Sequence, residues 1–174
     1  MKRSIFITCA MLFAFLLVPL FGYSQNRPIH EIHAMMIYNF TKYIQWPGYQ
    51  PSQDFIVAVI GSDDVYNTLN TWYGGQERGN KKFVIKKFSS PSDIQNCHIL
   101  YVGKGNSKQF DDIKAKLGGA STLLITDKPG LGKEGSGINF VTEGNKLSIE
   151  LNQSALDAAN LKVSSQLTSI AKLI

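Results

Sequence analysis

The sequence predicts one α/β domain with a mixed β-sheet of about six strands, flanked by helices on both faces. Apolar runs of strand length alternate along the chain with segments of helical periodicity, the order typical of a largely parallel sheet. Near the C-terminus, residues 137–141 and 147–151 alternate apolar and polar side chains on either side of a Glu-Gly-Asn turn, which predicts a hairpin. A chain of 174 residues is long enough for one such domain and its core.

The N-terminus has the pattern of a secretory signal peptide. A basic start precedes an apolar run at residues 5–21, and the small residues Gly22 and Ser24 follow at the spacing that a signal peptidase accepts. A transmembrane anchor is the alternative, but the run is short, contains Pro19 and is not followed by a positive cluster. We therefore expect residues 1–24 to be a cleaved signal peptide, residues 25–174 to form the domain, and the protein to reside in the periplasm.

Charge and cysteine content argue against nucleic-acid binding and against an intramolecular disulfide. Removal of residues 1–24 leaves 16 basic and 13 acidic residues, and most of the basic ones are scattered. This mild excess does not predict nucleic-acid binding. Cys9 leaves with the signal peptide, so Cys97 stands alone in an oxidising compartment and we expect no intramolecular disulfide.

The first helix of the domain is predicted over residues 28–43. Pro28 suits a first helical turn, and Glu31 is favourable near the positive end of the helix dipole. Pro47 ends the helix and restricts Trp46 to extended backbone, so the indole can project away from the helix axis. The apolar face is predicted from side chains at steps of three or four residues: Ile29, Ile32, Met36, Phe40 and Ile44.

Strands and helices then alternate along the chain. Apolar runs bounded by turn residues predict four strands, at residues 55–60, 82–88, 97–102 and 121–126. One helix is predicted at residues 64–72, capped by Ser62 or Asp63, and another at residues 107–117, ended by Gly118.

The C-terminal part is predicted to contain two short helices. Ser154 and Asp157 resemble a capping box that opens a helix to Asn160. A last helix follows Ser164 and Ser165. Its inner face is predicted to carry Leu167, Ile170 and Ala171.

Residue pairs that could support catalysis or metal binding favour structural roles. Cys97 and His98 are neighbours in a predicted strand, so their side chains point to opposite faces and cannot pair as nucleophile and base. We expect Cys97 to be buried. His30 and His33 lie three residues apart but have no third ligand nearby, so we expect one or two solvated histidines and no metal. The glycine-rich stretches match neither a phosphate-binding loop nor a dinucleotide fingerprint. The sequence therefore predicts no catalytic residue, no cofactor and no enzyme.

Aromatic and basic residues gather around the end of the first helix. Amphipathic rings are favoured at binding hot spots, and a lysine on the preceding turn suits an acidic partner or an anionic ligand. Some of these rings are expected to be core, with Trp46 the strongest candidate for recognition. The predicted partner- or ligand-binding residues are Trp46, Lys42, Tyr43 and Tyr49.

Five segments occur in an order found in one known family. They are FTKYIQWP at residues 40–47, CHILYV at 97–102, LLITD at 123–127, GINF at 137–140 and LKVSSQL at 161–167. These resemble the opening signature, the central Cys-His strand, the next strand, the Gly-x-Ile-x-Phe strand and the closing segment of YfiR-like periplasmic proteins. Together they cover nearly the whole chain after the signal peptide.

The resemblance implies a small periplasmic α/β regulator, commonly a homodimer. It implies a repressor that binds the extracytoplasmic part of a membrane-bound signalling enzyme, a diguanylate cyclase or a sensor kinase, and it implies no catalysis. The single Cys97 departs from the paired cysteines of a redox-responsive member, and Asn160 stands where the family tends to have glycine. A periplasmic small-molecule-binding module remains the alternative, because glycine-rich loops at strand ends can form a crevice.

Overall fold

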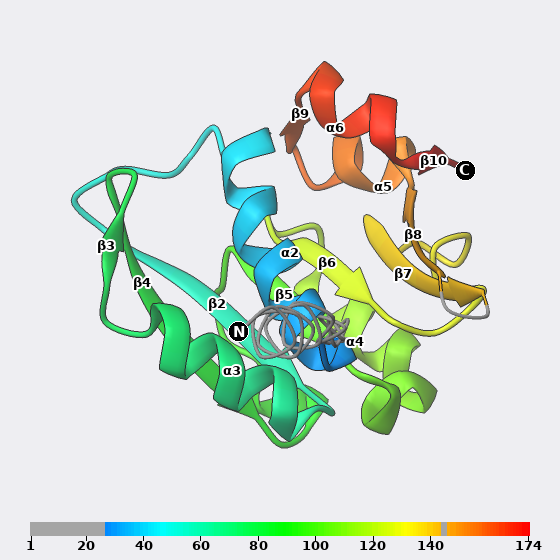
Figure 1. Ribbon diagram of the computed structural model, residues 1–174, viewed down its shortest axis with the longest axis horizontal. Helices are drawn as coiled ribbons and strands as arrows, with labels where there is room; N and C mark the ends of the chain where they lie inside the picture. Colours follow the sequence, from blue (N-terminus) through cyan, green and yellow to red (C-terminus); the bar gives the residue numbers. More distant parts are fainter. Residues whose placement is uncertain (1–26, 144–145) are drawn as a thin grey trace, which may run out of the picture.

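The protein is a mixed α/β domain built around one eight-stranded sheet (Figure 1). The computed structural model describes residues 27–143 and 146–174. The predicted signal peptide and the turn of the predicted hairpin lie outside these residues. The predicted class is confirmed, with eight strands in the sheet where about six were expected.

The strands of the large sheet are β2 (Asp54–Ile60), β3 (Glu77–Arg78), β4 (Lys81–Phe88), β5 (Ile99–Val102), β6 (Leu123–Thr126), β7 (Ile138–Glu143), β8 (Lys146–Leu151) and β10 (Lys172–Leu173). A separate two-stranded sheet is formed by β1 (Ile44–Gln45) and β9 (Lys162–Val163). The helices are α2 (Ile29–Tyr43), α3 (Asp63–Tyr73), α4 (Phe110–Leu117), α5 (Gln153–Ala158) and α6 (Ser165–Ile170), with 3-10 turns η2 (Pro91–Asp93) and η3 (Lys104–Gln109).

The sheet grows in both directions from β2. Its strand order is β10-β8-β7-β6-β5-β2-β4-β3. β2 pairs in parallel with β4 on one side and with β5 on the other, and β6 and β7 continue the parallel arrangement. β8 runs antiparallel to β7, which confirms the predicted terminal hairpin.

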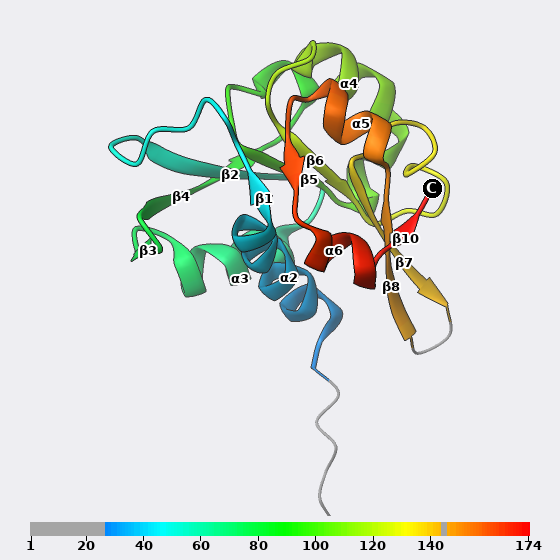
Figure 2. The same ribbon diagram turned by 90° about the horizontal axis from the view of Figure 1, so that it is seen from above.

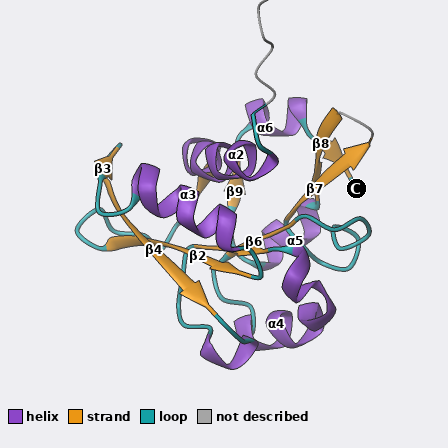
Figure 3. Cartoon of the chain, turned by 60° about the horizontal axis from the view of Figure 1, so that its bottom comes forward, coloured by secondary structure: helices purple, strands orange, loops and turns teal. Residues whose placement is uncertain are grey.

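Helices cover both faces of the sheet. α2, α3 and α6 lie on one side, and α4 and α5 lie on the other (Figures 2 and 3). Successive side chains of a strand point to opposite faces. Accordingly, Val57 and Val59 of β2 belong to the core layer under α2 and α3, whereas Ala58 and Ile60 belong to the layer under α4.

Helix α2 begins and ends where the sequence predicted, and Phe40 and Ile44 of its predicted apolar face are buried, but the buried face is centred on other residues. Its buried residues are His33, Ala34, Ile37, Phe40 and Thr41. Ile29, predicted to be on the apolar face, is 47% exposed. Of the two histidines, His33 is buried and not solvated: the ring stacks on Phe140 with 4.4 Å between centroids, and Nδ1 lies 2.9 Å from the hydroxyl of Tyr101. A polar side chain with such partners is accepted in the core, so the buried face of the helix includes His33.

The N-terminus of α3 and the C-terminus of α4 are capped as predicted. The Ser62 side chain accepts a hydrogen bond from the Val65 amide, and Gly118 ends α4 in the left-handed region at φ 54°. Asn160 adopts the same region at φ 55°, as a position that favours glycine requires.

The C-terminal helices correct two expectations. Asn152 caps α5, because its side-chain oxygen accepts a hydrogen bond from the Ala155 amide at 3.0 Å, so the predicted capping box at Ser154 is wrong. Ser164 caps α6 as predicted, and Leu167 is buried. Ile170 is 69% exposed, because the helix ends there and the chain turns into β10.

Candidate functional site

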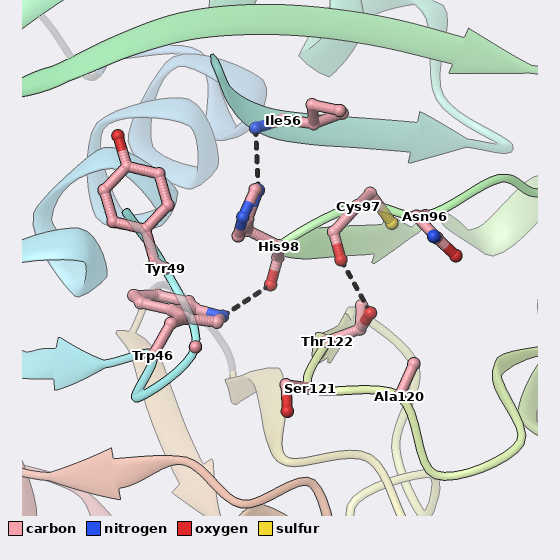
Figure 4. A pocket seen from close by; sticks show the side chains of 10 residues that line it. Trp46, Tyr49, Ile56, Asn96, Cys97, His98, Ala120, Ser121 and Thr122 are labelled. Carbon is pink, nitrogen blue, oxygen red and sulfur yellow. Dashed lines mark hydrogen bonds between the residues drawn. The ribbon is translucent and has the colours of Figure 1, made fainter. Parts of the chain in front are cut away.

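A pocket of about 310 Å³ opens at the amino-terminal ends of β5 and β6 (Figure 4). The loop after α2 forms one wall and the segments that enter the two strands form the other. Two of the four predicted binding residues, Trp46 and Tyr49, line this pocket together with Cys97, His98 and Thr122. The structure therefore brings the aromatic loop against the central Cys-His segment.

Trp46 is the inner wall of the pocket. Its indole nitrogen donates a hydrogen bond to the backbone oxygen of His98 at 2.9 Å (Figure 4). Its ring meets Phe55 edge-on, with 4.9 Å between the ring centroids. The side chain is only 7% exposed. The indole is thus packed into the domain and little of it is presented for recognition, because an indole that finds both an acceptor and an apolar partner is more stable when buried.

His98 is held in one orientation by the backbone. Its Nδ1 accepts a hydrogen bond from the Ile56 amide at 2.9 Å, and its ring stacks on Phe55 with 4.5 Å between centroids. The Tyr49 ring meets the His98 ring edge-on, with 5.2 Å between the ring centroids. Burial is the main cause that lowers the pKa of His98; the hydrogen bond with the Ile56 backbone acts in the opposite direction, and Lys81 adds a smaller lowering effect. The imidazole is therefore neutral and its Nδ1 lone pair is already used.

Cys97 does not pair with its neighbour. It packs in the core layer under α4, whereas the His98 ring lies against Phe55 in the other layer, which confirms that the two side chains face apart. Burial raises the pKa of the Cys97 thiol to about 12. The Thr122 hydroxyl donates to the Cys97 carbonyl at 2.7 Å and ties the two strand entrances together. A buried, protonated thiol has a structural role, not a nucleophilic one.

Next to the pocket residue Tyr49, a lysine lies over aromatic rings. Lys81 Nζ lies 5.8 Å from the ring centroid of Tyr49 and 5.7 Å from that of Phe55, within the range of a cation–π contact. Burial lowers the pKa of Lys81. The Tyr49 hydroxyl donates to the Gln53 carbonyl at 3.1 Å, which fixes the loop over the rim.

Lys42 belongs to a second group of rings and cations, near the end of α2. Its Nζ lies 4.8 Å from the ring centroid of Tyr38, and Tyr38 stacks on Tyr73 at 4.4 Å with the planes 9° apart. Arg78, on the two-residue strand β3, lies over both rings at 5.9 and 5.5 Å. We call Lys42, Arg78, Tyr38 and Tyr73 the cation–aromatic surface. Lys42 and Arg78 are exposed.

A chain of rings joins this surface to the pocket. Tyr38 lies 5.6 Å from Phe83, and Phe83 lies 5.5 Å from Phe55, which contacts both Trp46 and Tyr49. The remaining predicted residue, Tyr43, is half-buried and packs against the main core. The four predicted residues therefore divide between the pocket, the cation–aromatic surface and the core.

Several residues of the site were not predicted. Tyr38, Tyr73 and Arg78 lie on three different elements, α2, α3 and β3. No local sequence pattern predicts that these side chains contact one another. His98 was recognised as chemically interesting, but its stacking on Phe55 depends on the pairing of β2 with the segment that enters β5. The one available signal was the concentration of Tyr, Lys and Arg between residues 73 and 82.

The arrangement suits binding. Among residues 27–143 and 146–174, no group of three or more His, Cys, Asp or Glu side chains is placed to hold a metal ion. Over the same described ranges, no helix has the length and apolarity needed to cross a membrane. The site instead offers stacked rings, two exposed cations and a pocket with neutral polar edges.

Solved structures share the fold. A conserved domain protein from Vibrio cholerae O1 biovar El Tor superposes with a TM-score of 0.56 and 8% identity, over 83% of this chain and 59% of that one. The ABC domain in complex with L-Trp from Streptococcus pneumonia gives a TM-score of 0.52 and 8% identity, over 68% of this chain and 55% of that one. The chain thus spans less than two thirds of either structure. A search of curated proteins returns no match.

The family comparison is more specific than the fold comparison. The model of the YfiR/HmsC-like family matches residues 30–172, which is nearly all of the described chain. The match includes α2, the Trp46 loop, the central Cys-His segment and the closing residues of β9 and α6. These are the same segments on which the sequence resemblance rests. The chain belongs to the YfiR/HmsC-like family.

Proposed function

We propose that the protein is a periplasmic repressor that binds the extracytoplasmic part of a membrane-bound signalling enzyme such as a diguanylate cyclase. A membrane-bound sensor kinase is the second partner of this class. Family membership supports a regulatory role, and the cation–aromatic surface supports a protein partner. The observation that carries the proposal is the placement of Lys42 and Arg78 over the stacked rings of Tyr38 and Tyr73.

The chemistry of this surface fits an acidic partner. Arginine and tyrosine are enriched at interface hot spots, and the stacked rings support the two cations from below, so the cations lose less side-chain freedom when a partner docks on them. Two exposed cations attract a negatively charged patch and set its orientation during association. The partner surface is therefore expected to present carboxylates that pair with Lys42 and Arg78.

Cys97 and His98 are not arranged as a catalytic pair. The thiol of Cys97 is protonated at neutral pH, and the Nδ1 lone pair of His98 is used by the Ile56 amide. A nucleophile and a base in hydrogen-bond contact, as covalent catalysis requires, are not formed by this pair.

Deletion of the gene tests the proposal. If the protein represses a diguanylate cyclase, the deletion raises cellular cyclic di-GMP and the wild-type gene restores the original level. An unchanged level contradicts repression of a cyclase. N-terminal sequencing of the purified periplasmic form tests the location, with Gln25 expected as the first residue.

A small-molecule-binding module is the second candidate. The pocket of about 310 Å³ beside Trp46 and His98 favours it, because that volume is at the lower end of the range of ligand sites. Calorimetric titration separates the two functions: a module of this kind binds a periplasmic metabolite without a partner protein, whereas the repressor function requires the partner. We also propose a homodimer, which sedimentation of the exported form tests.

A further inference from the structure

A second cavity lies at the opposite edge of the sheet, at the carboxyl ends of β2, β5 and β6. The chain leaves β2 toward β4 on one side, while β5 pairs with β2 on the other, so the strand order reverses between β2 and β5. In open α/β sheets, ligands bind in the crevice at such a reversal. Here the crevice holds a cavity of about 130 Å³.

Three glycines allow the two loops of this crevice to approach closely. A Cβ atom on Gly103 would lie 2.5 Å from the carbonyl oxygen of Gly61, and one on Gly105 would lie 2.9 Å from the same oxygen. Gly61 itself adopts φ 79°, where a side chain is strained. The glycines keep the loops in contact at the base of the crevice, where side chains would separate them.

A hydrogen-bonded chain of three side chains lines the cavity. The hydroxyl of Tyr101 donates to Oδ2 of Asp127 at 2.9 Å, and Nδ1 of His33 lies 2.9 Å from the same hydroxyl. The Tyr101 hydroxyl has one hydrogen and uses it in the hydrogen bond that it donates to Asp127. The hydrogen in the bond between His33 and Tyr101 must therefore be carried by His33 Nδ1. His33 Nε2 is then a hydrogen-bond acceptor.

Two buried acceptors at this cavity have no partner within the described residues: His33 Nε2 and Asp127 Oδ1. His33 is 5% exposed. Burial is the main cause that lowers the pKa of His33 to about 4, with Lys104 and His30 acting in the same direction, so the ring is neutral. A buried acceptor without a donor is costly, and native proteins satisfy such groups with a ligand or a bound water.

The charges around the cavity select among possible donors. Lys104 lines the cavity and exerts a positive potential on both His33 and Asp127. The carboxylates of Asp64 and Asp127, which also line the cavity, offset that potential, so the charges favour no strongly charged ligand, and a neutral ligand can donate to the two acceptors and accept from the lysine. Ser62 and Thr142 add hydroxyl groups at the wall. Neutral molecules with hydroxyl groups on adjacent carbons meet these requirements.

We propose that this cavity is a binding site for a small neutral polyol, whose adjacent hydroxyls donate to His33 Nε2 and Asp127 Oδ1 and whose oxygen accepts from Lys104. The cavity volume corresponds to about four water molecules of ~30 Å³ each, which limits the ligand to a few carbon atoms. The site is separate from the Trp46 pocket, because the two open at opposite edges of the sheet.

Nuclear magnetic resonance of the exported chain, labelled with ¹⁵N in its histidines, tests the proposal with glycerol and erythritol as probes. The Nε2 resonance of His33 is expected to shift saturably with either probe, because the nitrogen gains a hydrogen bond. Asp127→Asn and Lys104→Gln each remove one charged contact and are expected to raise the dissociation constant, about tenfold for Asp127→Asn. Asp111→Asn, an exposed carboxylate on α4 that does not line the cavity, is the matched control and leaves binding unchanged.

Three results would overturn the proposal. One is the absence of a saturable His33 shift with both polyols up to about 100 mM, which means that only water occupies the cavity. Another is equal binding by wild type, Asp127→Asn and Lys104→Gln. The third is tighter binding of glycine, a zwitterion, than of either polyol, which shows that the site selects ammonium and carboxylate groups over hydroxyls. Lys104 is exposed, so its variant still tests the site if Asp127→Asn fails to fold.

Discussion

The indole nitrogen of Trp46 donates to the backbone oxygen of His98, 52 residues further along the chain, at 2.9 Å. This bond ties the loop after α2 to the segment that enters the central strand β5. The ring of the same histidine accepts a hydrogen bond from the Ile56 amide, so His98 connects three segments of the chain. The Trp-Pro pair and the Cys-His segment, which both belong to the family resemblance, therefore contact each other in the fold and hold the loop after α2 against β5.

Replacing Trp46 is expected to destabilise the domain. Trp46→Ala removes a large buried side chain and leaves a cavity, at a cost of about 3–5 kcal/mol in the free energy of unfolding. Trp46→Phe keeps an aromatic ring but loses the hydrogen bond to His98, at a cost of about 1–3 kcal/mol. Urea denaturation measures both changes in the free energy of unfolding. Trp72→Phe, at a half-buried position of α3, is the control. A Trp46→Ala protein as stable as wild type would return Trp46 to the surface role expected from the sequence.

Phe40→Ala is expected to cost about 3–5 kcal/mol of unfolding free energy, because Phe40 is 3% exposed and packs in the main core. Met35→Ala, on the exposed side of the same helix, is expected to stay within about 0.5 kcal/mol of wild type. Thermal or urea unfolding compares the pair. Similar effects of the two changes would mean that α2 buries another face.

Stability is expected to fall as the pH decreases from about 6.5 to 4. The pKa of His33 is lowered from 6.5 to about 4 in the folded protein, so in this window the unfolded chain binds the proton more readily. The contribution is fully present above pH 6.5 and amounts to up to about 3 kcal/mol. Unfolding curves across this range measure it. His33→Gln should flatten the dependence, and an unchanged slope in that variant would assign it to another group.

Cys97 is expected to resist modification in the folded protein. With its pKa raised to about 12, the thiolate is scarce at pH 8, and the side chain is 7% exposed. Alkylation by iodoacetamide should be slow until denaturant is added, and gel mobility should be the same with and without reductant. A dimer that disappears on reduction would show that the thiol is accessible.

The sequence predicts elements whose causes are local. The apolar run of β2, the Ser62 cap of α3 and the left-handed Gly118 depend on adjacent residues, and all appear as expected. The strands β3 and β10 have two residues each and no apolar run, so no pattern separates them from loop. They account for the difference between six and eight strands.

The candidate site depends on meetings between distant residues. His33 reads as a solvated histidine because Tyr101, its hydrogen-bond partner, lies 68 residues away. Trp46 reads as a presented side chain because its acceptor, His98, belongs to another strand. Composition around residue 46 locates the region, but the direction of each side chain follows from tertiary packing.

The most direct test of the account is charge reversal on the cation–aromatic surface. The double variant Lys42→Glu/Arg78→Glu is expected to fold with wild-type stability, because both side chains are exposed. Reintroduced into the deletion strain at wild-type abundance, it should leave cyclic di-GMP at the raised level, while the control Lys108→Glu/Lys116→Glu, distant on η3 and α4, restores repression. A double variant that lowers cyclic di-GMP as fully as wild type would contradict the assignment of this surface to partner binding.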